Sequence, residues 1–287
     1  MEYLKEFLKS LEGITTWIKV YALILSIIGV LKTSQKLIQL WNTRNLRKVW
    51  GIKDKENVIV ICSELDNPEE RQNVEPREFI YNLKYGDIDA YFEVIVTLLR
   101  LYPKLKLRIL SSGEAEKTRF DMAQTIILIG GPDYNHITSQ ILSKNLTQVI
   151  YKSPYCNEQS CSYPNEIVLH HKQQDKDYFE LDDLSDFGYF ERINNPHDPK
   201  KKIILIGGCH TIGVTAAVKA FSLSGSEHGE IPNVVLGNSK KVAKRIKKDS
   251  EFTVIVKAEK VGQSINIPVV KDETIIIKTY KTMEQNK

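Results

Sequence analysis

A six-residue stretch that occurs twice constrains the fold of this chain more than any other feature. Residues 126–131 and residues 203–208 both read Ile-Ile-Leu-Ile-Gly-Gly. An apolar β-branched run that stops at a glycine pair is typical of a buried parallel strand ending in a turn. A helix-like pattern follows each copy, so the sequence predicts two strand–turn–helix units of one design.

Ligands of open α/β sheets collect at the carboxyl ends of the strands, where backbone N–H groups and helix N-termini favour anions. The two turns therefore supply candidate ligand-binding residues: Gly130, Gly131, Asp133 and Asn135 in the first, and Gly207, Gly208, His210 and Thr211 in the second. The alternative is purely structural, because glycine is common after any buried strand. The second turn has neither Gly-x-Gly-x-x-Gly spacing nor the Lys-Ser/Thr pair of a P-loop, so phosphate binding is predicted but no cofactor is.

The N-terminal fifty residues differ in character from the rest. Residues 14–31 are apolar except for Thr15, Thr16, Lys19 and Ser26. As a helix this segment would be about 27 Å long, close to the ~30 Å hydrocarbon core of a bilayer. A buried helix and a signal peptide are the alternatives, but no cleavage pattern follows. We predict a transmembrane helix at about 14–31, within an anchor and connector that occupy residues 1–50.

Basic residues set the expected orientation of this helix. The span is followed by Lys32, Lys36, Arg44, Arg47 and Lys48. Positive charge of this kind stays on the cytoplasmic side of a membrane. We therefore expect a single-pass protein of the inner or cell membrane, with its C-terminal body in the cytoplasm and membrane lipid as one partner.

Periodicity divides the body into three parts. Residues 51–150 are expected to form a first α/β lobe, with strands at 57–62, 106–110 and 125–129 and helices at 87–101 and 135–142. Residues 151–200 are expected to form a strand-rich insert or sheet edge, preceded by a short strand at 149–151, with strands at 166–169 and 178–181. Residues 201–287 are expected to form a second lobe, with a helix at 213–221 and strands at 252–257 and 274–280. The predicted fold class is α/β: a Rossmann-like arrangement of two related βα lobes with a mainly parallel sheet, preceded by the transmembrane helix.

A basic helix is expected within residues 239–249. It carries Lys240, Lys241, Lys244, Arg245, Lys247 and Lys248. Such a cluster suits phosphates, nucleic acid or anionic lipid, although a solvated helix face has the same composition. We include Lys240, Lys241, Lys244 and Arg245 among the ligand-binding candidates. The formal net charge of +4 is too small to indicate nucleic-acid binding by itself.

Catalytic and metal-binding patterns are sparse, and we predict no catalytic residue and no metal. Cys156 and Cys161 precede His170 and His171, but Cys-x4-Cys is looser than most structural zinc sites. The four cysteines fit a reduced compartment, although an even number also permits two disulfides.

One loop near residue 195 offers two interpretations. Asn194, Asn195 and His197 lie beside Pro196, where loop residues often serve recognition. A turn stabilised by an asparagine side chain explains the asparagine pair equally well.

In its layout, an apolar span joined to an α/β body with Gly-Gly turns and a basic helix, the chain resembles the membrane effectors of prokaryotic anti-phage systems. The resemblance implies a homo-oligomer whose cytoplasmic body binds a nucleotide-derived ligand or short oligonucleotide that controls membrane permeability. It also implies a partner enzyme that makes the ligand. The alternative is a membrane-tethered enzyme that processes a nucleotide or nucleoside with Asp133, His197 or His210.

Overall fold

The structure is a computed structural model that describes residues 3, 21, 23–28, 30, 41, 43–64, 85–144, 146–152, 166–170, 176–180, 185–223, 231–247, 250–261 and 264–278. The chain divides into two compact units, Met1–Arg44 and Asn45–Lys287. Each unit is treated by itself below.

In the N-terminal unit, Tyr21, residues 23–28 and Val30 are helical, and their apolar side chains are exposed. Much of the predicted span at 14–31 lies outside the described residues. Within the described residues, no helix combines the length and the apolar character needed to cross a membrane.

The C-terminal unit alternates strands and helices over most of its length. Its elements are β1 (Asn57–Cys62), α3 (Tyr85–Leu101), β2 (Lys106–Ser111), α4 (Ser112–Thr118), β3 (Thr125–Ile129), α5 (His136–Ser143), β4 (Val149–Lys152), β5 (Glu166–His170), β6 (Lys176–Glu180), β7 (Ser185–Asn194), β8 (Lys202–Gly208), α6 (Thr211–Lys219), α7 (Asn233–Arg245), β9 (Phe252–Val261), β10 (Ser264–Ile265), η2 (Asp272–Thr274) and β11 (Ile275–Ile277).

One mixed sheet joins the strands predicted for both lobes, in the order β10-β9-β7-β8-β3-β1-β2, with β11 paired to β9. Strands β2, β1, β3 and β8 are mutually parallel, whereas β7 runs antiparallel to both β8 and β9. The two copies of the repeated stretch are neighbours in this sheet. Ile126 lies opposite Ile203, and the pairing continues in step to Ile129 and Ile206. Strands β4, β5 and β6 form a separate antiparallel sheet, whereas β7, which also falls within residues 151–200, belongs to the main sheet.

The chain winds outward from β1 in both directions. Helix α3 carries it from β1 to β2 on one side, and the next connection, through α4, returns past β1 to β3 on the other. The direction of winding therefore changes between β1 and β3. In open α/β sheets, such a switch point marks the usual ligand position, because the loops leaving the two strands diverge there.

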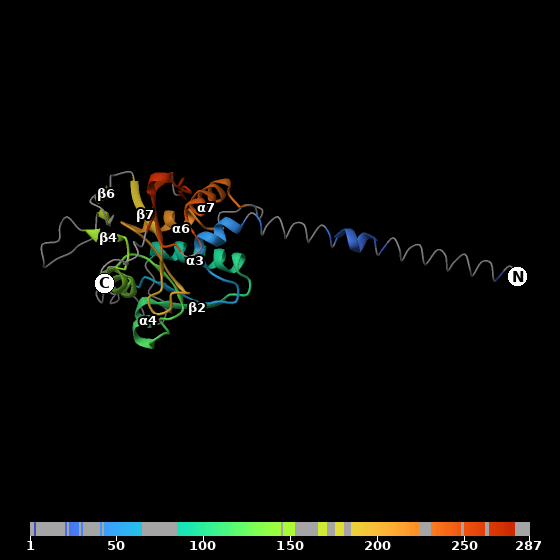
Figure 1. Cartoon of the computed structure of the whole chain (residues 1–287), viewed down its shortest axis with the longest axis horizontal. Helices are drawn as coiled ribbons and strands as arrows, with labels where there is room; N and C mark the ends of the chain where they lie inside the picture. Colours follow the sequence, from blue (N-terminus) through green and yellow to red (C-terminus); the bar gives the residue numbers. More distant parts are fainter. Residues whose placement is uncertain are drawn as a thin grey trace, which may run out of the picture. The chain divides into compact units, whose positions relative to one another are not determined.

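Both faces of β1, β3 and β8 are buried, which explains their nearly continuous apolar sequences, whereas β2 at the edge is largely exposed. Alternate residues point into two cores. One core contains Val58 and Val60 together with residues of α3, α6 and α7, and the other contains Ile59 and Ile61 together with residues of α4 and α5. Figure 1 shows α4 well apart from α3 and α6, in agreement with this layering.

The end of the connector is fixed to the body by a buried arginine. Residues 43–50 are helical, and the helix ends at Gly51, whose φ of 68° suits glycine. Arg192 of β7 donates from Nη1 to the carbonyl oxygens of Lys48 (2.6 Å) and Val49 (2.8 Å). Trp50 is also buried, and its indole N–H donates to the carbonyl oxygen of Phe221. The cation thus satisfies carbonyl groups that a helix C-terminus leaves without partners.

Several elements differ from the sequence-based expectation. No strand was predicted over residues 185–194, where β7 is ten residues long, because Asp186, Glu191 and Arg192 obscure its apolar pattern. Helix α4 was not expected at all. Helix α7 begins at Asn233, earlier than the predicted basic helix, and ends at Arg245.

Candidate ligand site at the carboxyl edge of the sheet

The first Gly-Gly turn lies at the switch point of the strand order, the usual ligand position in open α/β sheets. It follows β3, next to the loop that follows β1. Gly130 has a φ of 101° and donates its N–H to the carbonyl oxygen of Ile206. A Cβ at this position would overlap the hydroxyl of Ser63 and lie 2.8 Å from a carboxylate oxygen of Asp87. Only glycine fits here, so Gly130 determines the path of the turn.

The four predicted residues of this turn have different roles in the structure. Asn135 is fully buried; its side chain accepts a hydrogen bond from the N–H of Thr138 and donates to the carbonyl oxygens of Ile61 and Ile129. Asn135 therefore caps α5 and ties it to two strands. Gly131 is half-buried, and Asp133 is exposed. Of the polar side chains predicted in this turn, Asp133 is the one placed to meet a ligand.

The loop after β1, which was not among the predicted site residues, completes this edge. Ser63 donates from its hydroxyl to the carbonyl oxygen of Ile129, and Glu64 donates its backbone N–H to that of Tyr134. The Glu64 carboxylate accepts from the Ser111 hydroxyl and the Gly113 N–H, both at 2.8 Å. The loops after β1, β2 and β3 are thereby joined. Ser63 and Glu64 directly follow a predicted strand, and this position was the sequence signal that could have identified them as site residues.

The second Gly-Gly turn already holds an anion of the protein itself. The carboxylate of Asp186, on β7, accepts from the backbone N–H groups of Phe187 (2.7 Å), His210 (3.2 Å) and Gly213. These last two groups belong to the start of α6, the place where a phosphate would bind. Desolvation raises the pKa of Asp186, and the three backbone hydrogen bonds oppose that rise. The predicted phosphate site at this turn is therefore occupied by a carboxylate.

Close backbone packing explains the glycines of this second turn. Gly208 lies opposite Gly188 of β7, and a Cβ on Gly208 would lie 2.6 Å from the backbone nitrogen of Val214. A Cβ on Gly188 or Gly213 would overlap backbone atoms of the other segment. Gly207 is buried within β8, whereas His210 is exposed and Thr211 half-buried at the start of α6.

The basic residues of α7 do not join this edge. Lys241 and Arg245 donate to the carbonyl oxygens of Val270 and Asp272, while Lys240 and Lys244 are exposed. The C-terminal half of α7 packs by the connector, because Lys48 donates to the carbonyl oxygen of Ala243. The connector in turn is held by Arg192, which lies opposite Ile204, near the start of β8. The basic cluster and the Gly-Gly turns therefore lie toward opposite ends of β8.

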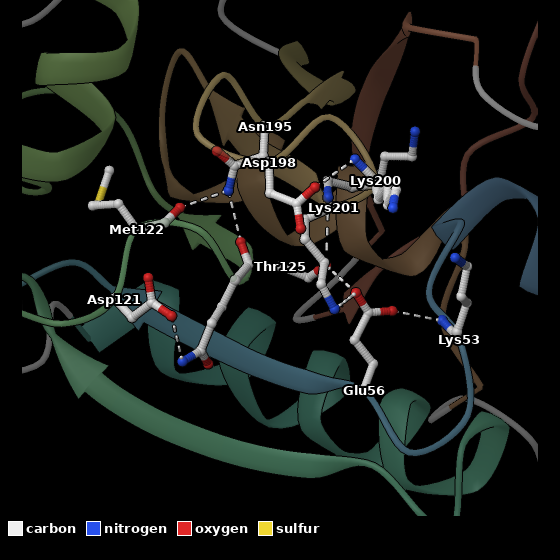
Figure 2. Close-up of polar contacts among 11 residues, drawn as sticks. Lys53, Glu56, Asp121, Met122, Thr125, Asn195, Asp198, Lys200 and Lys201 are labelled. Atoms are coloured by element: carbon white, nitrogen blue, oxygen red, sulfur yellow. Dashed lines mark hydrogen bonds and ion pairs between the residues drawn. The ribbon is translucent and has the colours of Figure 1, made fainter.

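A polar network closes the amino ends of the strands (Figure 2). Glu56 accepts from the Thr125 hydroxyl (2.6 Å), the Lys201 ammonium (3.0 Å) and the Lys53 N–H (2.8 Å). Asn195 donates to the carbonyl oxygens of Met122 and Gln124.

Asn195 thus stabilises a turn, which was one of the two interpretations of this loop. Its side-chain oxygen accepts from the N–H of His197, which forms the expected asparagine turn. His197 lies before β8 and His210 after it, so a seven-residue strand, about 23 Å, separates them. His197 does not share a site with His210 or Asp133.

The described cysteines do not suggest catalysis. Cys62 and Cys209 are buried thiols, and burial raises the pKa of the Cys62 thiol to about 12. A thiol of this kind is not a nucleophile at neutral pH. No group of three metal-ligating side chains occurs in the described parts of the chain. Cys156, Cys161 and His171, from the zinc pattern weighed above, lie outside the described residues.

The carboxyl edge of the parallel strands therefore combines a constrained glycine turn with several acidic side chains. The carboxylates are those of Glu64, Asp87, Asp133 and Asp186. Comparison of the chain with models of protein families gives no match, and comparison with curated proteins gives none either.

Proposed function

We propose that this protein is a homo-oligomeric membrane effector whose α/β body binds a nucleotide-derived ligand at the β1/β3 edge. The observation that carries the proposal is the strand order, which puts the loop of Ser63 and Glu64 beside the turn of Gly130 and Asp133 at a switch point. The resemblance in layout to anti-phage membrane effectors points the same way.

The charges at this edge define which part of a ligand would be recognised there. Asp133 is exposed, and Glu64 and Asp87 lie close to the same turn. Carboxylates accept hydrogen bonds and repel phosphate. The site therefore suits the hydroxyl groups of a ribose and the amino groups of a base. Since Asp186 also occupies the start of α6, any phosphate of the ligand would be directed away from this edge.

The N-terminal unit supplies the proposed membrane contact. The described helical residues between Tyr21 and Val30 expose apolar side chains, which water solvates poorly. Basic residues follow the apolar segment, as they do on the cytoplasmic side of a membrane. Within the C-terminal unit, Arg192 and Trp50 hold the residues at which the connector ends.

The test is ion flux from liposomes that contain the full-length protein, after addition of ATP, a cyclic dinucleotide or a short oligoadenylate. We expect one of these probes to change flux and to be retained in native mass spectra. Asp133→Ala should weaken the response about 10- to 100-fold, the range for one or two lost hydrogen bonds to a charged group. The matched control is Glu116→Ala on the exposed face of α4.

The outcome against this proposal is equally specific. If no probe binds, or if both variants bind the probe as the original chain does, the site assignment is wrong. If a probe is consumed without any flux, the tethered nucleotide-processing enzyme is the better account.

A further inference from the structure

Helix α3 has two apolar faces, although a single chain covers only one of them. The inner face buries Ala90, Val94, Leu98 and Leu101 against the sheet and α6. The outer face carries Phe92, Val96 and Leu99, which are 59%, 40% and 49% exposed. Large apolar side chains that lie exposed together on one helix face are typical of a surface that contacts another molecule. The three outer residues are called the outer seam below.

The spacing of the outer seam identifies what would cover it. Asp89, Phe92, Val96 and Leu99 follow one another at intervals of three, four and three residues. This is the spacing with which one helix packs along another in a coiled-coil pair. A partner helix of the same kind therefore fits the seam.

Charge at the two ends of the seam favours a second copy of this helix in antiparallel orientation. Asp89 lies in α3 seven residues, about 10 Å, before Val96, and Lys104 lies in the turn that follows the end of the helix at Leu101; both are exposed. A twofold axis at Val96 would bring the Asp89 end of each helix toward the Lys104 turn of the other. Phe92 of each copy would then face Leu99 of the other.

We propose that α3 forms the dimer contact of this protein, as an antiparallel pair of α3 helices related by a twofold axis at Val96. Such a contact is self-complementary, as twofold interfaces must be. It specifies the subunit contact of the homo-oligomer proposed above and so rests on that proposal. It involves α3 and not the β1/β3 loops, so ligand binding and pairing can be tested separately.

The first test is a disulfide cross-link in the full-length protein in mild detergent. Val96→Cys places two thiols next to the twofold axis, and we expect a covalent dimer under mild oxidation. The original chain shows any cross-linking by its own cysteines, and Glu116→Cys on α4 is the matched control. A Val96→Cys protein that cross-links no more than this control would overturn the proposal.

The second test reverses charges to check the orientation. Asp89→Lys places like charges together twice in each dimer, and we expect dimerisation to weaken about tenfold. Adding Lys104→Asp should restore it, because the pair is exchanged across the axis. Mass photometry over a dilution series measures both, and circular dichroism confirms that the exposed substitutions leave the fold intact. If the double variant is no tighter than Asp89→Lys alone, the antiparallel register is wrong.

A third variant separates this proposal from the proposed function. Val96→Asp puts two carboxylates at the axis and should reduce the dimer to half its mass, while the ligand probe that binds the original chain still binds. If the Val96→Asp protein keeps the mass of the original dimer, the subunit contact lies elsewhere, and this conclusion does not depend on whether the ligand probe binds.

Discussion

Glu191 should make the stability of the body fall as pH rises from about 4.5 to about 7. This carboxylate of β7 is 1% exposed. One oxygen accepts from the N–H of Gln148 at 2.6 Å, and among the described residues the other has no hydrogen-bond partner. Burial raises the pKa of Glu191 from 4.5 to about 7, with the Gln148 N–H opposing the rise.

The sign of the effect follows from where the proton is held. Between pH 4.5 and 7 the folded protein keeps a proton on Glu191 that the unfolded chain releases. The folded state therefore loses stability as pH rises through this window, and the loss levels off above pH 7. With these two pKa values the free energy of unfolding should fall by about 2–3 kcal/mol between pH 5 and pH 8, at about 1.4 kcal/mol per unit of pH within the window.

Glu191→Gln removes this titration and keeps an oxygen for the Gln148 N–H. We expect its unfolding free energy, relative to the original chain, to rise by about 2–3 kcal/mol from pH 5 to pH 8. Guanidinium unfolding at several pH values, followed by fluorescence of the buried Trp50, measures the difference. Glu116→Gln, exposed on α4, is the control. Parallel pH profiles for Glu191→Gln and the original chain would refute the reasoning.

Four further predictions concern packing and helix stability. Arg192→Met leaves the carbonyl groups of Lys48 and Val49 without a donor, so the free energy of unfolding should fall by about 3 kcal/mol or more. Hydrogen exchange at residues 45–50 should become faster, and unchanged exchange would show that Arg192 does not hold this segment. Asn135→Ala removes a helix cap and two buried hydrogen bonds, for a loss of about 2–3 kcal/mol in denaturant unfolding. Gly208→Val should lower the free energy of unfolding by more than about 2 kcal/mol, because its side chain would overlap backbone atoms. Gly237→Ala, which has open space around it, should stabilise α7 by about 1 kcal/mol. A variant with the melting temperature of the original chain would contradict its prediction.

The parallel core could be predicted because burial on both faces leaves a simple trace in the sequence. Residues 57–62 and 125–129 are the strands that the apolar runs predicted, and helix α3 contains the predicted 87–101. Strand β7 could not be found in this way, since Glu191 and Arg192 are buried by partners distant in the sequence, Gln148 and the connector. Periodicity does not reveal such partners.

The candidate site was predicted in part, for a similar reason. The edge of the sheet follows from glycines at strand ends, but the choice between the two turns depends on what fills each one. Asp186 lies more than twenty residues before His210 in the chain, yet it takes the N–H groups at the start of α6. Helix α4 did leave a signal, the Ser111 and Glu114 capping box, which was readable from the sequence.

The meeting of β7, β8 and α6 has a consequence for evolutionary divergence. Gly188, Gly208 and Gly213 each lie where a Cβ would strike backbone atoms, so substitution at any one of them requires the others to move. Selection can change most surface residues and much of the apolar core while this corner stays the same. Descendants that have diverged beyond recognition elsewhere should still carry Asp-x-Gly on one strand, followed by Gly-x4-Gly at the end of the next. We therefore expect this spaced pattern to identify distant relatives better than overall sequence identity does.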